Sequence, residues 1–329
     1  MLTRVCLKAL VIVLTALWGA CALWYPSSFG SDVRLAMVVA WLVFTLAALY
    51  SLFWRVSQKM LWAYFLVFAG ILMGWLMLPP SNQRQWTDDL ARMTTAEVRG
   101  NHVMLRNVRD FDWHSDTNYR AHWDVREYDL DQLAGVDMLL SYWDGPAIAH
   151  TLVSFGFRDG RQVVFSVEVR KEQGEAFSEL GGFFKHFELS VVAADERDIV
   201  RVRTNVRGED VYLYRIALSP EARRALFLAY AEAANQLVVQ PRFYNTLSTN
   251  CTTLVYAMMK HIEPDLPLDY RLLVSGYLPS YVQEVGGLDG RYTLEQLRAM
   301  GRITDRARAA GDAVDFSAQI RRGIPELPE

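Results

Sequence analysis

Three long apolar runs follow one another in the first 80 residues, and they constrain the fold more than any other feature of the sequence. They lie at about residues 7–24, 35–54 and 60–78. Each approaches the roughly 20 residues that an α-helix needs to cross the hydrocarbon core of a bilayer. Core helices of a soluble protein are also apolar, but three such runs in succession favour membrane spans. We therefore predict a membrane region with three transmembrane helices over residues 1–80.

Positive charges between the runs predict on which side of the membrane the remaining chain lies. Arg4 and Lys8 stand at the start of the first run, and Arg55 and Lys59 separate the second from the third. The connection at residues 25–32 carries no lysine or arginine. Short loops rich in Lys and Arg stay in the cytoplasm. The chain after the third run is therefore predicted to lie on the outer side of the inner (cytoplasmic) membrane.

The first run could instead be a cleaved signal peptide. Residues 17–21 are faintly similar to a lipoprotein cleavage site, but Trp18 stands where leucine is expected. We therefore expect an uncleaved span.

Charge and cysteine content limit the functions that the outer part, residues 81–329, can have. The formal net charge is −3, and nothing in it indicates a nucleic-acid partner. Cys6 and Cys21 belong to the apolar N-terminus, which leaves Cys251 as the only cysteine beyond it. A lone thiol in an oxidising compartment is a liability unless it is buried or functional.

Cys251 stands where a polar stretch meets a predicted helix. Residues 244–253 are rich in Asn, Ser and Thr, and residues 254–260 are apolar. Such polar residues before an apolar run are typical of helix N-caps. Cys251 is then expected in the first turn, where free N–H groups and the helix dipole favour a thiolate and can bind an oxyanion. The alternative is a small buried thiol at the start of an ordinary helix.

The outer part is predicted to form one α+β domain, with an antiparallel sheet and packed helices. Strands are expected at residues 103–113, 136–142, 150–157, 162–169, 187–192, 199–204 and 211–216, and helices at 87–99, 220–237 and after Cys251. Asp159-Gly160 indicates a hairpin turn. Residues 114–128 show no clear period and are predicted to be a loop. The tail from residue 294 is expected to be helical and then to fray.

A thiol nucleophile needs a base, and His150 is the preferred candidate. His261 lies ten residues after Cys251 on the same predicted helix, about 15 Å away. The other histidines precede the sheet or lie among aromatic residues. His150 opens a strand after a turn, which places it at a partly exposed end of the sheet. A histidine with a purely structural role at the sheet edge is the alternative.

The predicted hairpin brings a third group towards His150. With a three-residue turn, the residue numbers of each cross-strand pair add up to 318, so that Glu168 lies opposite His150 on the same face of the sheet. A carboxylate there would orient the imidazole and stabilise its cation. With a two-residue turn, Val169 is the partner and Glu168 faces away. A surface pair of Glu168 with Arg170 or Lys171 is the structural alternative.

A metal site is also conceivable in the polar region before the sheet. His114, His122, Asp116 and Asp124 supply ligand types, but their spacing fits no zinc pattern. We predict no metal and no cofactor.

These motifs together resemble the periplasmic domain of the Lnb family of lipoprotein intramolecular transacylases. The resemblance spans about residues 106–290. The matching pieces are residues 149–157, 166–170, 244–245 and 250–253, with 187–189, 196–198 and 203–205 similar in the same order. In that family a Cys and a His are the implied catalytic pair, and these roles fall on Cys251 and His150.

The resemblance also implies a fold. A His on a strand followed by a Cys on a later helix is the order of circularly permuted papain-like enzymes, including lecithin retinol acyltransferase-like proteins. Their third polar group lies on the strand after the His, which agrees with Glu168. The membrane region, residues 1–80, matches no specific subgroup, and relatives with other membrane regions can use other acyl donors.

The activity that the resemblance implies is transfer of an acyl chain to the α-amine of a lipoprotein. His150 would take the proton of Cys251, and the thiolate would attack an ester of a membrane lipid or lipoprotein. Backbone N–H groups after Cys251, with the Asn250 amide, would hold the oxyanion, and an acyl-thioester would form. The alternatives are a cysteine peptidase or amidase of the cell envelope and a non-enzymatic envelope protein.

Overall fold

The computed structural model describes residues 2–26, 29–54 and 56–327. The chain divides into two compact units. The first comprises Met1–Ser81, Phe177–Glu188 and Phe243–Thr246, and the second comprises Asn82–Ala176, Leu189–Arg242 and Leu247–Glu329. The predicted domain limits, residues 1–80 and 81–329, stay a proposal.

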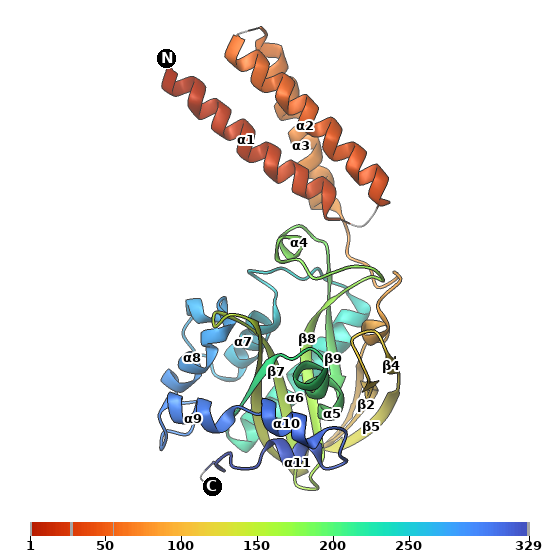
Figure 1. Cartoon of the computed structure of the whole chain (residues 1–329), viewed down its shortest axis with the longest axis vertical. Coiled ribbons are helices and arrows are strands. Elements are labelled where there is room, and N and C mark those ends of the chain that lie inside the picture. Colours follow the sequence, from red (N-terminus) through yellow and green to blue (C-terminus); the bar gives the residue numbers. More distant parts are fainter. Residues whose placement is uncertain (1, 27–28, 55, 328–329) are drawn as a thin grey trace. The chain divides into compact units, whose positions relative to one another are not determined.

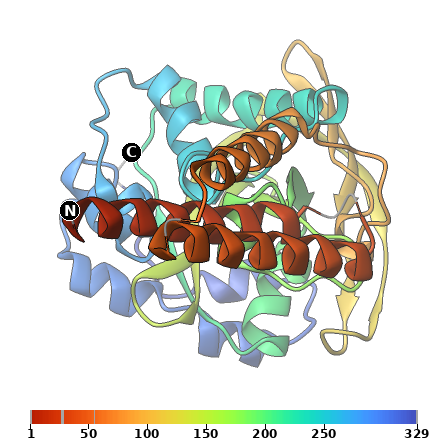
Figure 2. The ribbon, with the colours of Figure 1, turned by 90° about the horizontal axis from the view of Figure 1, so that it is seen from above.

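Three long helices make up most of the first unit. They are α1 (Leu2–Trp24), α2 (Ser31–Trp54) and α3 (Gln58–Met77). Each is long and apolar enough to cross a membrane, and the three pack against one another (Figures 1 and 2). The prediction of three N-terminal spans is therefore confirmed.

Polar atoms and one small residue hold the three helices together. The indole N–H of Trp41 donates to the carbonyl of Ala16 at 2.9 Å, and the hydroxyl of Tyr64 donates to that of Ile12 at 2.9 Å. A Cβ at Gly19 would come within 2.7 Å of the Trp41 indole nitrogen. Small residues and interhelical hydrogen bonds are the usual means of helix association in membranes.

A later segment belongs to the same unit and contains the short helix α4 (Glu179–Phe183). Lys185 donates to the carbonyl oxygens of Trp75 at 2.8 Å and Leu76 at 3.0 Å, at the C-terminal end of α3. A cation is favourable there because the last carbonyls of a helix carry partial negative charge.

The second unit is built on an eight-stranded, mostly antiparallel sheet in the order β1-β2-β9-β8-β7-β6-β10, with β5 paired to β2. These strands are β1 (Thr95–Arg99), β2 (His102–Arg109), β5 (Trp123–Asp129), β6 (Leu133–Asp144), β7 (Ile148–Phe157), β8 (Gln162–Arg170), β9 (Glu188–Ala194) and β10 (Asp210–Arg215). A separate ribbon pairs β3 (Asp112–Trp113) with β4 (Tyr119–Arg120). The predicted α+β class is confirmed.

Helices and single turns cover both faces of this sheet (Figure 1). They are η1 (Asp88–Leu90), η2 (Leu130–Gln132), α5 (Glu196–Arg201), η3 (Val202–Val206), α6 (Pro220–Val239), α7 (Cys251–Ile262), η4 (Tyr270–Leu272), η5 (Ser275–Tyr277), α8 (Leu278–Glu284), α9 (Leu294–Gly301), α10 (Thr304–Ala310) and α11 (Phe316–Ile320).

Successive side chains of each strand point to opposite faces of the sheet, so that a hydrophobic core lies on each face. Leu139 and Leu152 pack with Ile199 of α5, Ile303 and Phe316 on one face. The neighbouring residues of β6 and β7 point the other way, towards α6, α7 and α8. On that side four aromatic rings pack edge to face or stacked, those of Phe155, Phe165, Phe227 and Tyr230.

Four elements differ from the prediction. The expected helix at 87–99 is the turn η1 and the strand β1, and the expected loop at 114–128 contains β4 and β5. The expected strand at 199–204 is helical, because Asp195 caps α5 by accepting the N–H of Arg197. The expected fraying of the tail is not seen as far as Ile324, since Ile303, Phe316 and Ile320 are buried and Ile324 packs against this core; residues 328–329 lie outside the described residues.

The register of the β7–β8 hairpin is confirmed. Leu152 pairs with Ser166 and Gly156 with Gln162, so that paired positions sum to 318 as in the three-residue turn. His150 and Glu168 therefore lie on the same face of the sheet.

Candidate active site

The start of α7 fixes the position of the thiol. Cys251 is the first residue of the helix, and Asn250 is its N-cap. The Asn250 side-chain oxygen accepts the N–H groups of Thr252 at 2.9 Å and Thr253 at 2.8 Å. In return, the Thr253 hydroxyl accepts the N–H of Asn250 at 2.8 Å, which completes a capping box. The predicted N-cap is confirmed, and the thiol lies where the helix dipole favours a thiolate.

This cap changes which amides are available to a substrate. The N–H groups of Thr252 and Thr253, which follow the thiol, already donate to Asn250. The N–H of Cys251 itself has no hydrogen-bond acceptor recorded among the described residues. The geometry therefore favours the Cys251 amide over the two that follow it as an oxyanion donor, and it gives the Asn250 side-chain oxygen a positioning role.

Asn250→Ala should lower the thermal unfolding midpoint of the full chain in detergent by a few degrees. Loss of an N-cap costs about 1 kcal/mol, which corresponds to roughly 2–4 °C for a domain of this size. Asn250→Ser is the matched control, because serine keeps a capping oxygen and should melt close to the wild type. Equal melting of the alanine and serine variants would contradict the capping role.

His150 meets the thiol at the place where two strands separate. The recorded β7–β8 pairing begins only at Leu152, beyond Thr151. The imidazole of His150 lies close enough to the thiol of Cys251 for each group to shift the pKa of the other, and the backbone N–H of Thr151 also lowers the pKa of the thiol. Nε2 of His150 faces away towards β8, so that Nδ1 is the ring nitrogen left for the thiol.

The other side of the imidazole contacts a buried polar network. His150 Nε2 lies 2.7 Å from the Ser166 hydroxyl and 3.2 Å from a carboxylate oxygen of Glu168. The Ser166 hydroxyl donates to Glu168 at 2.6 Å, and Arg203 of η3 donates to the same oxygen at 3.1 Å. Ser166 is fully buried and Arg203 is 6% exposed. The carboxylate is thus held by three partners and orients the imidazole.

Neighbouring charges outweigh burial at each of the three ionisable groups. Burial lowers the pKa of His150, but the Glu168 carboxylate raises it to about 9, with a smaller contribution from the Cys251 hydrogen bond. Burial raises the pKa of Cys251, but the hydrogen bond and charge of His150 bring it below its ordinary value. Burial also raises the pKa of Glu168, but His150 and Arg203 hold it well below its usual range. These shifts favour a thiolate beside an imidazolium over the two neutral groups.

The structure brings Cys251, His150 and Glu168 together, with Asn250 as the cap that places the thiol. Ser166 and Arg203 were missed as site residues. Ser166 stands two positions before Glu168 on the same strand face, so the alternation of β8 could have identified it. Arg203 had no such signal, because it was assigned to a strand and lies in a helical turn.

The possible metal ligands are arranged differently. His122 and Asp124 lie with Asp110, and their ligand atoms are within 4.8 Å of one another. His122 faces a carboxylate with each ring nitrogen, and Arg126 lies 3.0 Å from Asp124 and 3.5 Å from Asp110. These carboxylates are thus already engaged by the side chains of His122 and Arg126.

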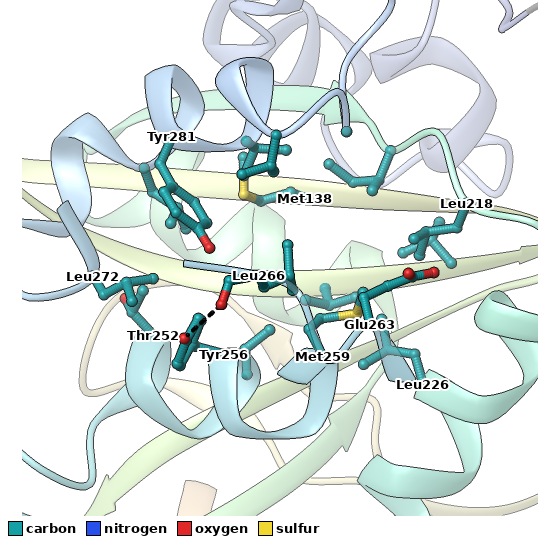
Figure 3. Close-up of a pocket in the computed structure, with 18 of the residues that line it drawn as sticks. Met138, Leu218, Leu226, Thr252, Tyr256, Met259, Glu263, Leu266, Leu272 and Tyr281 are labelled. Carbon is teal, nitrogen blue, oxygen red and sulfur yellow. Dashed lines mark hydrogen bonds between the residues drawn. The ribbon is translucent and has the colours of Figure 1, made fainter. Parts of the chain in front are cut away.

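An apolar cavity of about 580 Å³ lies beside the start of α7 (Figure 3). Thr151 and Thr252, the neighbours of His150 and Cys251, form part of its wall. Their hydroxyls are 3.3 Å apart, and the Thr252 hydroxyl is 3.8 Å from the sulfur of Cys251. The candidate nucleophile is therefore next to a cavity of the size that binds small apolar ligands.

Comparison with known families assigns a domain to this part of the chain. The family model described as the Lnb N-terminal periplasmic domain matches residues 119–276. The chain contains an Lnb periplasmic domain. The matched segment includes His150, Glu168, Arg203 and Cys251, and it ends before α8. Searches of curated proteins and of solved structures gave no significant match.

The Lnb domain also indicates in which compartment of the cell the chain lies. Three candidate membrane helices precede it, and the domain family is periplasmic. The protein is therefore a multi-pass membrane protein with a periplasmic C-terminal domain, as predicted.

Proposed function

We propose that this protein is a membrane-anchored thiol acyltransferase that acts on acyl esters of lipids or lipoproteins. The observation that carries the proposal is the proximity of Cys251, His150 and Glu168, in which the thiol has a lowered pKa and the imidazole a raised one. Membership of the Lnb domain family and the apolar cavity at Thr252 support a lipid substrate over a peptide.

The first half-reaction forms an acyl-thioester. The Cys251 thiolate attacks the ester carbonyl, a C–S bond forms, and the C–O bond to the donor breaks. The departing alkoxide takes a proton from the imidazolium of His150 and leaves as an alcohol. Glu168 keeps the ring oriented and stabilises its cation until that proton is transferred.

The second half-reaction returns the enzyme to its starting state. An amine of the acceptor attacks the thioester carbonyl while neutral His150 accepts a proton from it, the C–S bond breaks, and an amide is released. The regenerated thiolate again faces an imidazolium. In both steps the N–H of Cys251 is available to the developing oxyanion, and the positive end of the α7 dipole favours that charge.

Incubation of the full chain in detergent with a diacylated lipopeptide tests the proposal directly. We expect intact-mass spectrometry to show one acyl group on Cys251, removable by neutral hydroxylamine, and a lipopeptide with an acylated amine. A parallel incubation with peptidoglycan fragments tests the amidase alternative. Folded protein that cleaves those fragments and leaves the lipopeptide unchanged would overturn the acyltransferase proposal.

A further inference from the structure

The apolar cavity beside the thiol follows one face of α7 along most of the helix. The residues of α7 in its wall are Thr252, Val255, Tyr256 and Met259, and Glu263 follows at the helix end. Their spacing of three or four residues places them in a single stripe. From Thr252 to Glu263 the helix rises about 16 Å. Figure 3 shows this stripe, with Thr252 at one end of the cavity and Glu263 at the other.

The remaining walls are apolar as well. Met138 and Val153 belong to the sheet, Leu218 precedes α6 and Leu226 belongs to α6. The segment around α8 contributes further lining residues. The two tyrosines, Tyr256 and Tyr281, direct their hydroxyls to backbone carbonyls, Tyr256 to Leu266 at 3.1 Å and Tyr281 to Pro267 at 2.9 Å. Their rings can therefore line the cavity with carbon.

The two ends of the cavity differ in chemistry. At one end, the Thr252 hydroxyl is 3.8 Å from the sulfur of Cys251. At the other end, the lining includes Glu263 and Asp265, which are both exposed to solvent. A hydrocarbon chain attached at the sulfur would thus lie in apolar surroundings until it reached the carboxylates.

We propose that this cavity binds the acyl chain of the thioester in an extended form and that its length sets a preference for chains of about 14 carbons. The inference rests on the proposed acyl transfer. An extended chain advances about 1.2 Å per bond, as the extended polypeptide does at about 3.6 Å for three bonds. About 13 bonds therefore cover the 16 Å from Thr252 to Glu263. Carbons beyond that point would emerge beside the carboxylates and bury no further surface.

The test is competition between two acyl donors in one reaction. The full chain in detergent is offered equal amounts of p-nitrophenyl octanoate and p-nitrophenyl myristate, and intact-mass spectrometry gives the ratio of the two acyl groups on the protein. Each buried methylene favours binding by up to about fourfold. We expect wild type to prefer the 14-carbon chain at least tenfold, and a homologous series to level off beyond that length.

Met259→Trp would fill the cavity about 10 Å from its start, where roughly eight bonds fit. We expect this variant to lose its preference for the longer chain, so that the ratio falls at least tenfold while octanoate still reacts. Leu218→Trp obstructs the same half of the cavity from the opposite wall and should lower the chain-length ratio in the same way. Ala257→Trp is the matched control, because Ala257 lies on the exposed face of the same helix, and its ratio should equal that of wild type.

The outcomes separate this inference from the proposed function. Failure of wild type to form any acyl-thioester would reject the acyltransferase itself. Thioester formation with an unchanged chain-length ratio in both folded cavity variants would reject the cavity as the acyl site and leave the acyltransferase intact. A melting curve for each variant shows whether it is folded.

Discussion

Replacement of Cys251 by alanine is expected to reduce acyl transfer at least about 10⁴-fold while the domain stays folded. Catalytic groups that act as one unit lose nearly all their effect when the nucleophile is removed, and losses of the order of 10⁴ to 10⁶ are typical. The thiol contacts His150, the amide of Thr151 and the hydroxyl of Thr252. None of these can form the thioester in its place. The measurement is the rate of amine acylation on a diacylated lipopeptide.

Cysteines elsewhere in the chain provide the controls for this variant. Cys6 and Cys21 are free thiols in α1, and their alanine variants should keep the wild-type rate. Cys251→Ser keeps the shape of the side chain but offers a hydroxyl that is far less acidic than a thiol, so it should be nearly as inactive as alanine. A folded Cys251→Ala protein that retains a tenth of the wild-type rate would remove the thiol from the mechanism.

Replacement of His150 by alanine is expected to change both rate and pH dependence. Loss of a positioned acid and base costs about 10²–10⁴-fold. Wild-type Cys251 has a pKa below its ordinary value, so iodoacetamide should alkylate it readily at neutral pH. Without His150, burial is the leading influence left and raises the thiol pKa above the unperturbed value of about 8.5. Alkylation at pH 7 should then be slower than in the wild type.

The alkaline limb of the pH–rate profile of acyl transfer depends on the protonation of His150 itself. The pKa of His150 is raised to about 9, so the imidazolium is present below that pH and is lost as the pH rises through it. Acyl transfer from an ester should therefore decline only above about pH 9. Glu168→Gln removes the charge that raises this pKa most, and the decline should move towards the ordinary histidine value of about 6.5.

His102 supplies a matched control for these pH measurements. It is exposed and lies 3.3 Å from the Glu127 carboxylate, but it is remote from the thiol in sequence and on a different strand. His102→Ala should leave the rate and the profile unchanged. If His150→Ala and Glu168→Gln also gave wild-type profiles, the proposed proton transfers would be wrong.

The parts of the site that the sequence predicted are those set by local rules. An Asn and a Thr around Cys251 define a helix start, and the thiol follows in the first turn. The turn before Arg161 fixes the hairpin register and hence the face shared by His150 and Glu168. These relations depend on residues close in sequence, which is why periodicity and turn chemistry were sufficient.

The parts that were missed depend on tertiary packing. Residues 199–204 are rich in β-branched side chains, which favoured a strand, but buried Asp198 accepts from Arg109, Phe111 and Trp113 and holds the segment as a helix. The helix brings Arg203 to Glu168. β1 was taken for a helix, yet it pairs with β2 and its Ala96 N–H donates to Asn235 of α6. Partners so far away in the chain leave no local pattern.

The packed tail extends the hydrophobic core beyond the stretch that matches the family. Arg321, just after α11, forms ion pairs with Asp137 at 2.8 Å and Glu196 at 2.6 Å, and both acids are buried. A fragment ending at residue 276 would keep every candidate catalytic group, but Asp137 and Glu196 would lose their ion pairs with Arg321 and one face of the sheet would be exposed. We therefore expect the periplasmic part to complete its fold during export only after residues beyond Cys251, as far as Arg321, have crossed the membrane.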